Sequence, residues 1–162
     1  MAQADYFLKI EGIEGESADS KHKAEIEIES FSWGESQTGA HSSGGGGGAG
    51  KVAMQDFHFV TKINKASPKL FLACAKGEHF KKAVLTCRKA GGEQQEYLKW
   101  TLTDVLVSSY QSGGSAHGEL VPTDQVSLNF AQIDVEYKEQ KPDGTLGGSV
   151  KAGYDLKANK AK

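Results

Sequence analysis

The chain has little of several residue types, and each scarcity excludes a class of protein. Cys74 and Cys87 are its only cysteines, too few for a disulfide framework and without the paired spacing of a zinc site. We expect two free thiols that pack as small apolar side chains. No apolar run approaches the roughly 20 residues that a membrane-spanning helix needs.

An excess of either charge is also missing. The 162 residues carry 19 Lys and Arg against 21 Asp and Glu, a formal net charge of -2. This balance gives no electrostatic footprint for nucleic acid. Residues 1–10 have neither the basic start nor the long apolar stretch of a secretory signal peptide. We therefore expect a cytoplasmic chain that leaves the cell only through a machine that reads no signal peptide.

The charges that are present are spread unevenly along the chain. Residues 1–35 hold nine acidic and three basic residues, whereas residues 138–162 hold six lysines and three acidic residues. Two explanations stay open. The asymmetry serves solubility, or the acidic and basic ends meet across subunits, because complementary charge selects the orientation of a complex.

Glycine, by contrast, is concentrated in one run, which fills all but one position of residues 44–50. With Lys51 this run matches the glycine and lysine spacing of a phosphate-binding loop, but Val52 stands where Ser or Thr should hold magnesium. The run also leads into an expected strand rather than a helix. Ordering so many glycines costs several kcal/mol of entropy. We therefore expect a mobile surface loop, or a loop that another protein holds.

Apolar and polar residues alternate along much of the chain, which is the pattern of half-buried strands. The two longest stretches, 96–110 and 125–138, both change phase midway, as strands do when they turn a corner between packed sheets or around a barrel. In the segment 25–33 a smaller phase change falls near Ser30. Further strands are expected over residues 6–10, 52–60 and 83–89.

One helix is expected, over about residues 67–76. Ser67 suits the N-cap, Pro68 suits the first helical position, and Gly77 suits a left-handed C-terminal cap. Many strands, one short helix and glycine turns predict a mainly β fold. We expect a small barrel of two packed, largely antiparallel sheets with one short flanking α-helix.

No residue pattern in the chain predicts catalysis or metal binding. The five histidines are scattered, without the i, i+4 spacing of a helical zinc site, and those at positions 22, 41 and 117 are expected in solvated loops. Glu25, Glu27 and Glu29 share a parity along one strand, which is typical of a wet face rather than of paired catalytic carboxylates. We therefore expect no enzymatic activity, no metal and no cofactor.

The order and spacing of many short motifs nevertheless resemble one family over nearly the whole chain, the haemolysin-coregulated proteins (Hcp) of bacterial type VI secretion. The residues that carry the resemblance are 31–34, 44–51, 55–57, Lys62, 67–70, 73–74, Gly77, 88–92, 97–98, 105–109, 113–114, 126–133 and Tyr137. Each motif is weak alone, and their common order is specific.

The resemblance implies a function that the composition alone does not indicate. Hcp proteins are small barrels with a helix alongside; six form a ring, and rings stack into a tube that a contractile sheath ejects behind a VgrG-type spike. Some carry small effectors in the lumen. The resemblance thus implies one Hcp-like domain over residues 1–162, a homohexamer, secretion without a signal peptide and no fused toxin. Nucleic acid and membrane insertion are not expected.

Two surfaces are candidates for contacts with other molecules. The ring-stacking surface is expected at Gln37, Gly44, Gly45, Gly46, Gly47, Gly48, Gly50 and Lys51, because glycines let two backbones approach closely. The lumen or a packing face is expected at Glu25, Glu27 and Glu29. The alternative is a monomeric β-barrel module that binds a small effector or a peptide, and the size of the oligomer separates the two.

Overall fold

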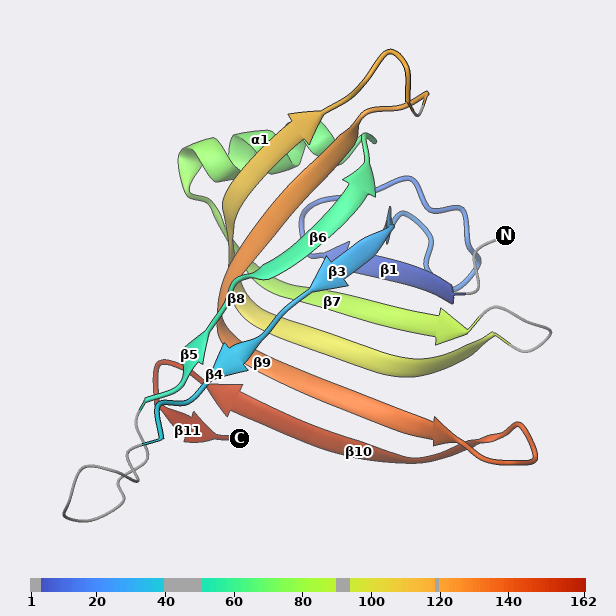
Figure 1. Cartoon of the computed structure of the whole chain (residues 1–162), viewed down its shortest axis with the longest axis vertical. Helices are drawn as coiled ribbons and strands as arrows, with labels where there is room; N and C mark the ends of the chain where they lie inside the picture. Colours follow the sequence, from blue (N-terminus) through green and yellow to red (C-terminus); the bar gives the residue numbers. More distant parts are fainter. Residues whose placement is uncertain (1–3, 40–50, 90–93, 119) are drawn as a thin grey trace.

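A computed structural model describes residues 4–39, 51–89, 94–118 and 120–162 (Figure 1). The expected helix is present as α1 (Ser67–Lys76). The strands are β1 (Ala4–Ile10), β2 (Ile26–Ile28), β3 (Ser30–Ser32), β4 (Glu35–Ser36), β5 (Ala53–Met54), β6 (Phe57–Lys62), β7 (His79–Lys89), β8 (Gln95–Gly113), β9 (Thr123–Gln140), β10 (Leu146–Asp155) and β11 (Lys160–Ala161).

The strands form an antiparallel sheet in the order β11-β10-β9-β8-β7-β1-β2, and β6 joins it by pairing with both β9 and β3. The short strands β4 and β5 pair only with each other among the described residues, as a separate two-stranded sheet. The prediction of a mainly β, antiparallel fold with one short helix is therefore confirmed.

The sheet does not close into the predicted barrel. The expected strand over residues 25–33 bends at Glu29 and is split into β2, which pairs with β1, and β3, which pairs with β6. The half of the sheet that contains β1 and β2 and the half that contains β3 and β6 are held together at the bend by two hydrogen bonds. The Glu29 N–H donates to the Val60 carbonyl (2.8 Å), and the Thr61 hydroxyl donates to the Glu27 carbonyl (2.9 Å). Because β2 and β3 are successive pieces of one segment, no continuous ladder joins the halves.

The long strands β8 and β9 turn a corner, as their phase changes predict, and so belong to both halves of the sheet (Figure 1). In β8 the corner lies at Asp104, whose φ of 56° is rare for a residue other than glycine. This kink lets Leu102 and Val105 both face the core, although strict alternation would put them on opposite sides. A register shift between β8 and β9 follows at Val107/Ser109.

The helix α1 begins and ends as predicted, but Ser67 is not its N-cap. Ala66 occupies that position, and its N–H donates to the Asn64 Oδ1 (2.8 Å). The Ser67 hydroxyl instead donates to the fully buried carboxylate of Asp124 (2.5 Å), which ties the start of the helix to β9. At the other end Gly77 adopts the expected left-handed conformation, with φ of 65°.

The core lies between the two halves of the sheet and under α1. Phe57 and Phe59 of β6 are completely buried in it, and both cysteines are free, as expected. Burial raises the pKa of the Cys87 thiol to about 12. At ten residues, α1 is far too short to cross a bilayer, and no other helix occurs in the described ranges.

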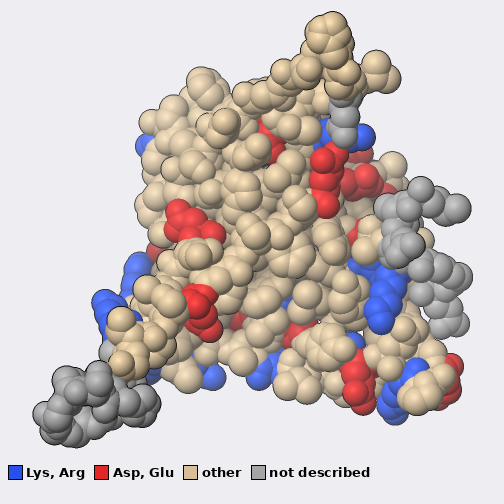
Figure 2. All heavy atoms as spheres, in the orientation of Figure 1, with Lys and Arg blue, Asp and Glu red and all other residues tan. Residues whose placement is uncertain are grey.

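The molecule has two unlike ends along its long axis. The tip that joins β8 to β9 lies at one end, with Leu120 fully exposed, and β10, β11 and the hairpin β4–β5 lie toward the other (Figure 1). On the face that Figure 2 shows, small acidic and basic patches are scattered over a mostly uncharged surface, and neither sign dominates. This distribution agrees with the charge balance of the sequence.

Candidate functional site

The predicted stacking surface falls on the connection between β4 and β5. These strands form a hairpin in which Glu35 pairs with Met54 and Ser36 pairs with Ala53. Gln37 and Lys51, at the two ends of the connection, are exposed. The predicted glycines at positions 44–48 and 50 lie outside the described residues. The hairpin therefore places the start and the end of the segment side by side at one end of the molecule.

The three predicted glutamates do not form one solvent-exposed face. Glu25 precedes β2, and its side chain is only 12% exposed because its carboxylate bonds the ring of His22. Glu27 is exposed in the middle of β2, and Glu29 is exposed at the bend that follows, 4.0 Å from the ammonium of Lys62. The structure thus separates Glu25 from the other two.

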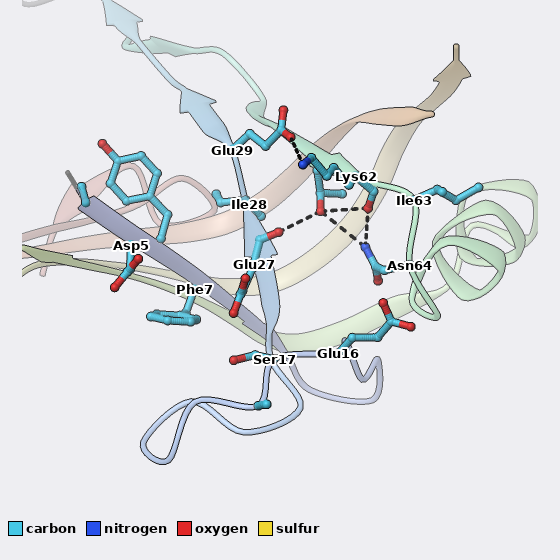
Figure 3. Close-up of a pocket in the computed structure, with 14 residues that line it drawn as sticks. Asp5, Phe7, Glu16, Ser17, Glu27, Ile28, Glu29, Lys62, Ile63 and Asn64 are labelled. Atoms are coloured by element: carbon cyan, nitrogen blue, oxygen red, sulfur yellow. Dashed lines mark hydrogen bonds and ion pairs between the residues drawn. The ribbon is translucent and has the colours of Figure 1, made fainter. Parts of the chain in front are cut away.

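Glu27 and Glu29 line an open groove of about 940 Å³ beside β1 and β2, which we call the acidic groove (Figure 3). Four carboxylates and one lysine line it: Asp5, Glu16, Glu27, Glu29 and Lys62. Of its apolar residues, Phe7 and Ile28 are buried, and Ile63 is 43% exposed. The groove combines an apolar lining with an excess of negative charge, which suits a partner that is apolar and basic.

A buried ionic cluster supports the wall of this groove. The Arg88 guanidinium is almost fully buried and donates to Asp19 (2.8 and 3.0 Å) and to Asp5 (3.1 Å). Hydrogen bonds from Arg88 lower the pKa of Asp19 from 3.8 to about 2. The same bonds raise the pKa of Arg88. Arg88 therefore fastens the loop that follows β1 to the outside of the sheet.

The prediction that His22 is solvated is wrong. Its ring is buried, stacks on Phe7 with a centroid separation of 4.5 Å, and lies 2.9 Å from the carboxylate of Glu25 and 2.6 Å from that of Glu96. The Arg88 guanidinium also lies over the ring of Phe7, at 4.7 Å from its centroid. Because Phe7, Arg88 and Glu96 are distant from His22 in sequence, no local pattern pointed to this cluster.

The described residues hold no arrangement that suggests catalysis. No group of three or more His, Cys, Asp or Glu side chains in the described ranges could hold a metal ion. The thiol of Cys87 is buried, and its raised pKa disfavours the reactive thiolate. The hydroxyl of Ser108 donates to Asp56, and no histidine joins that pair in the hydrogen bonds of the described residues.

Comparisons with known proteins agree with this description. The sequence model of the family described as "Type VI secretion system effector, Hcp" matches residues 7–137. "Protein hcp1" of Pseudomonas aeruginosa is 52% identical over 157 residues, which cover 96% of each chain. Among solved structures, Hcp1 from Salmonella typhimurium is 41% identical, with a TM-score of 0.82 and coverage of 99% of this chain and 100% of that one.

Another solved structure, described as a type six secretion system protein, superposes with a TM-score of 0.92 at 31% identity. That match covers 98% of this chain and 99% of the other. The likeness therefore extends over both halves of the bent sheet and over the helix, rather than over one shared motif.

Proposed function

This chain belongs to the Hcp family of type VI secretion system proteins, and from this premise we propose that its copies close into hexameric rings that stack into the ejected inner tube. The observation that carries the proposal is the 52% identity to an Hcp protein along 96% of both chains. A likeness of that extent supports the same mode of assembly for this chain. As an Hcp of type VI secretion, the chain is a secreted protein.

The partners of such a tube follow from the same premise. We infer that a VgrG-type spike caps the stack, that a contractile sheath surrounds it, and that small effectors travel in its lumen. The chain would be cytoplasmic before assembly and would leave the cell with the tube.

The two candidate surfaces take different parts in this proposal. The segment from Gln37 to Lys51 contacts the adjacent ring, and the exposed ends of the β4–β5 connection support this assignment. Glu27 and Glu29 contact cargo or a neighbouring copy through the acidic groove. Glu25 has no such part, because its carboxylate is committed to His22.

The size of the particle in solution tests the proposal. Native mass spectrometry of the purified protein at micromolar concentration should give a hexamer, and negative-stain microscopy should give rings of uniform diameter. A monomer in both experiments would contradict the proposal. It would favour instead the monomeric module, for which the acidic groove is the binding site for a small effector or a peptide.

A further inference from the structure

The ring of His22 is buried between two carboxylates that come from different parts of the chain. Its Nδ1 lies 2.9 Å from the Oε2 of Glu25, in the same loop, and its Nε2 lies 2.6 Å from the Oε1 of Glu96, in β8. The side chain of His22 is only 9% exposed and that of Glu25 only 12%. Water therefore has little access to the ring or to the nearer carboxylate.

With both carboxylates ionised, both contacts are hydrogen bonds only if both ring nitrogens carry a proton. A carboxylate only accepts, and a neutral imidazole has one N–H and one lone pair, so a neutral ring could donate to only one of the two. The imidazolium donates to both and supplies a positive charge that compensates them. The geometry therefore fits the charged form of His22.

The other basic side chains around the ring are committed elsewhere or lie on the surface. The Arg88 guanidinium bonds the two aspartates of the ionic cluster, and Lys138 lies 3.8 Å from Glu136. The hydrogen bond from Arg88, aided by a positive charge on His22, lowers the pKa of Asp19 to about 2. The charged groups on the elements around the ring are Asp5, Asp19, Lys21, Lys23, Glu25, Glu27, Arg88, Glu96, Lys99, Glu136 and Lys138.

His22 anchors the turn over residues 20–23. Before this turn, Asp19 is fixed by the ionic cluster. After it, the Ala24 N–H donates to the Ser17 carbonyl (2.8 Å). Between these two fixed points the ring of His22 joins the turn to β8. The position of the turn against the sheet therefore depends on the hydrogen bonds of one titratable side chain.

We propose that His22 is a proton-dependent clamp, which fastens the turn over residues 20–23 to β8 while the ring is charged and releases it when the ring loses a proton. Whichever nitrogen loses the proton, one carboxylate then faces a lone pair, and a hydrogen bond becomes a repulsion. The clamp is therefore present at lower pH and is lost as the pH rises. Arg88 stays protonated throughout, so the ionic cluster keeps its hold on Asp19.

The clamp acts beside the acidic groove. The turn directly follows residues 16–18, which line that groove (Figure 3). Release of the turn would therefore loosen the support of one wall of the groove as the pH rises. The inference goes beyond the proposed function and does not depend on it.

Proteolysis after Lys21 and Lys23 reports on the turn, because both lysines are exposed and flank His22. A lysine-specific protease is applied at about pH 6 and about pH 9, and each rate is divided by the rate for a synthetic peptide of the same sequence, which removes the pH dependence of the protease. The corrected rate for wild type should rise about tenfold between the two pH values. For His22→Gln it should be high at both. A wild-type rate that does not change with pH would overturn the inference.

Glu96→Gln separates the clamp from a general effect of alkaline pH. The amide introduced there can accept from the charged ring and can donate to the ring nitrogen that has lost its proton, so the turn should stay fastened in both states. The corrected rate should therefore remain low at about pH 9. If this variant opens with pH as wild type does, the inference fails.

Thermal unfolding gives a second test that does not require a protease to reach the turn. The midpoint of His22→Gln should lie below that of wild type at about pH 6, and the difference should shrink as the pH rises to about 9, because wild type then loses the clamp as well. His117→Gln, at an exposed histidine between β8 and β9, should follow wild type throughout. A difference for His22→Gln that stays constant or grows with pH would contradict the clamp. The size of the wild-type particle tests the proposed function separately.

Discussion

The side chain of Arg88 connects the loop that follows β1 to the sheet. Its guanidinium joins Asp19, in the loop after β1, to Asp5 in β1, and it also packs on Phe7. A buried charge is tolerated only when it is paired and hydrogen-bonded. The loop over residues 11–25 therefore depends on this pairing for its place against the sheet and beside the acidic groove.

This pairing predicts a stability that is sensitive to acid. Arg88 lowers the pKa of Asp19 from 3.8 to about 2, so its contribution to folding is present above pH 3.8 and is lost as the pH falls through about 2. Asp19→Asn should lower the thermal midpoint at neutral pH, and the difference from wild type should shrink between pH 3.8 and pH 2. Thermal unfolding followed by circular dichroism at each pH measures it.

Glu11→Gln serves as the control for this series, because Glu11 is exposed and makes no side-chain ion pair among the described residues. Its curve should follow wild type at every pH. A difference between Asp19→Asn and wild type that stays constant down to pH 2 would show that the carboxylate of Asp19 does not titrate with folding.

Among the elements, the loop after β1 depends on one close backbone approach. The N–H of Gly15 donates to the Ala24 carbonyl (2.8 Å), and the chain packs so tightly there that a Cβ at Gly15 would lie 2.5 Å from the Glu25 carbonyl oxygen. Gly15→Ala should therefore destabilise the protein by about 1–3 kcal/mol, since backbone atoms must shift to make room. Urea unfolding measures the loss.

Gly113→Ala is the matched control at the end of β8, where a Cβ would meet no atom within 4 Å. Its free energy of unfolding should stay within about 0.5 kcal/mol of wild type. Equal effects of the two substitutions would mean that glycine content, rather than the close approach at Gly15, sets the stability.

The sequence predicted those elements whose signal is local. Alternation located β1, β6, β7 and most of β8 and β9, and the combination of Pro68 and Gly77 located α1. It did not locate β10, because Gly147, Gly148 and Gly153 weaken any strand pattern there. The sequence also did not show whether the sheet closes into a barrel. Closure depends on the bend at Glu29, where β2 pairs with β1 and β3 pairs with β6.

The candidate site was less predictable than the fold because it depends on contacts between segments that are distant in sequence. The parity of Glu25, Glu27 and Glu29 suggested one shared face, but parity holds only within a continuous strand, and β2 begins after Glu25. The acidic groove draws its lining from β1, β2, β6 and two loops, a contact set that no short window of sequence contains. A charge count pointed to an acidic N-terminal region without locating it on the surface.

For the whole molecule, the segment between β4 and β5 gives a prediction about assembly. Replacing Gly46, Gly47 and Gly48 with leucine should leave single rings intact and reduce their stacking, because the bulk would prevent the close approach between rings that glycine permits. Sedimentation and negative-stain microscopy separate rings from tubes. Serine at the same three positions should have a smaller effect, and tubes that form normally from the leucine variant would rule out this contact.

The difference between the two ends of the molecule has a consequence for anything built by repeating it along its long axis. The tip with Leu120 is at one end, and the β4–β5 hairpin lies toward the other, beside β10 and β11 (Figure 1). A column in which every copy points the same way presents hairpins on its first surface and tips on its last. Such a column has a polarity, so the two termini would grow at unequal rates, and a cap shaped for one terminus would not fit the other.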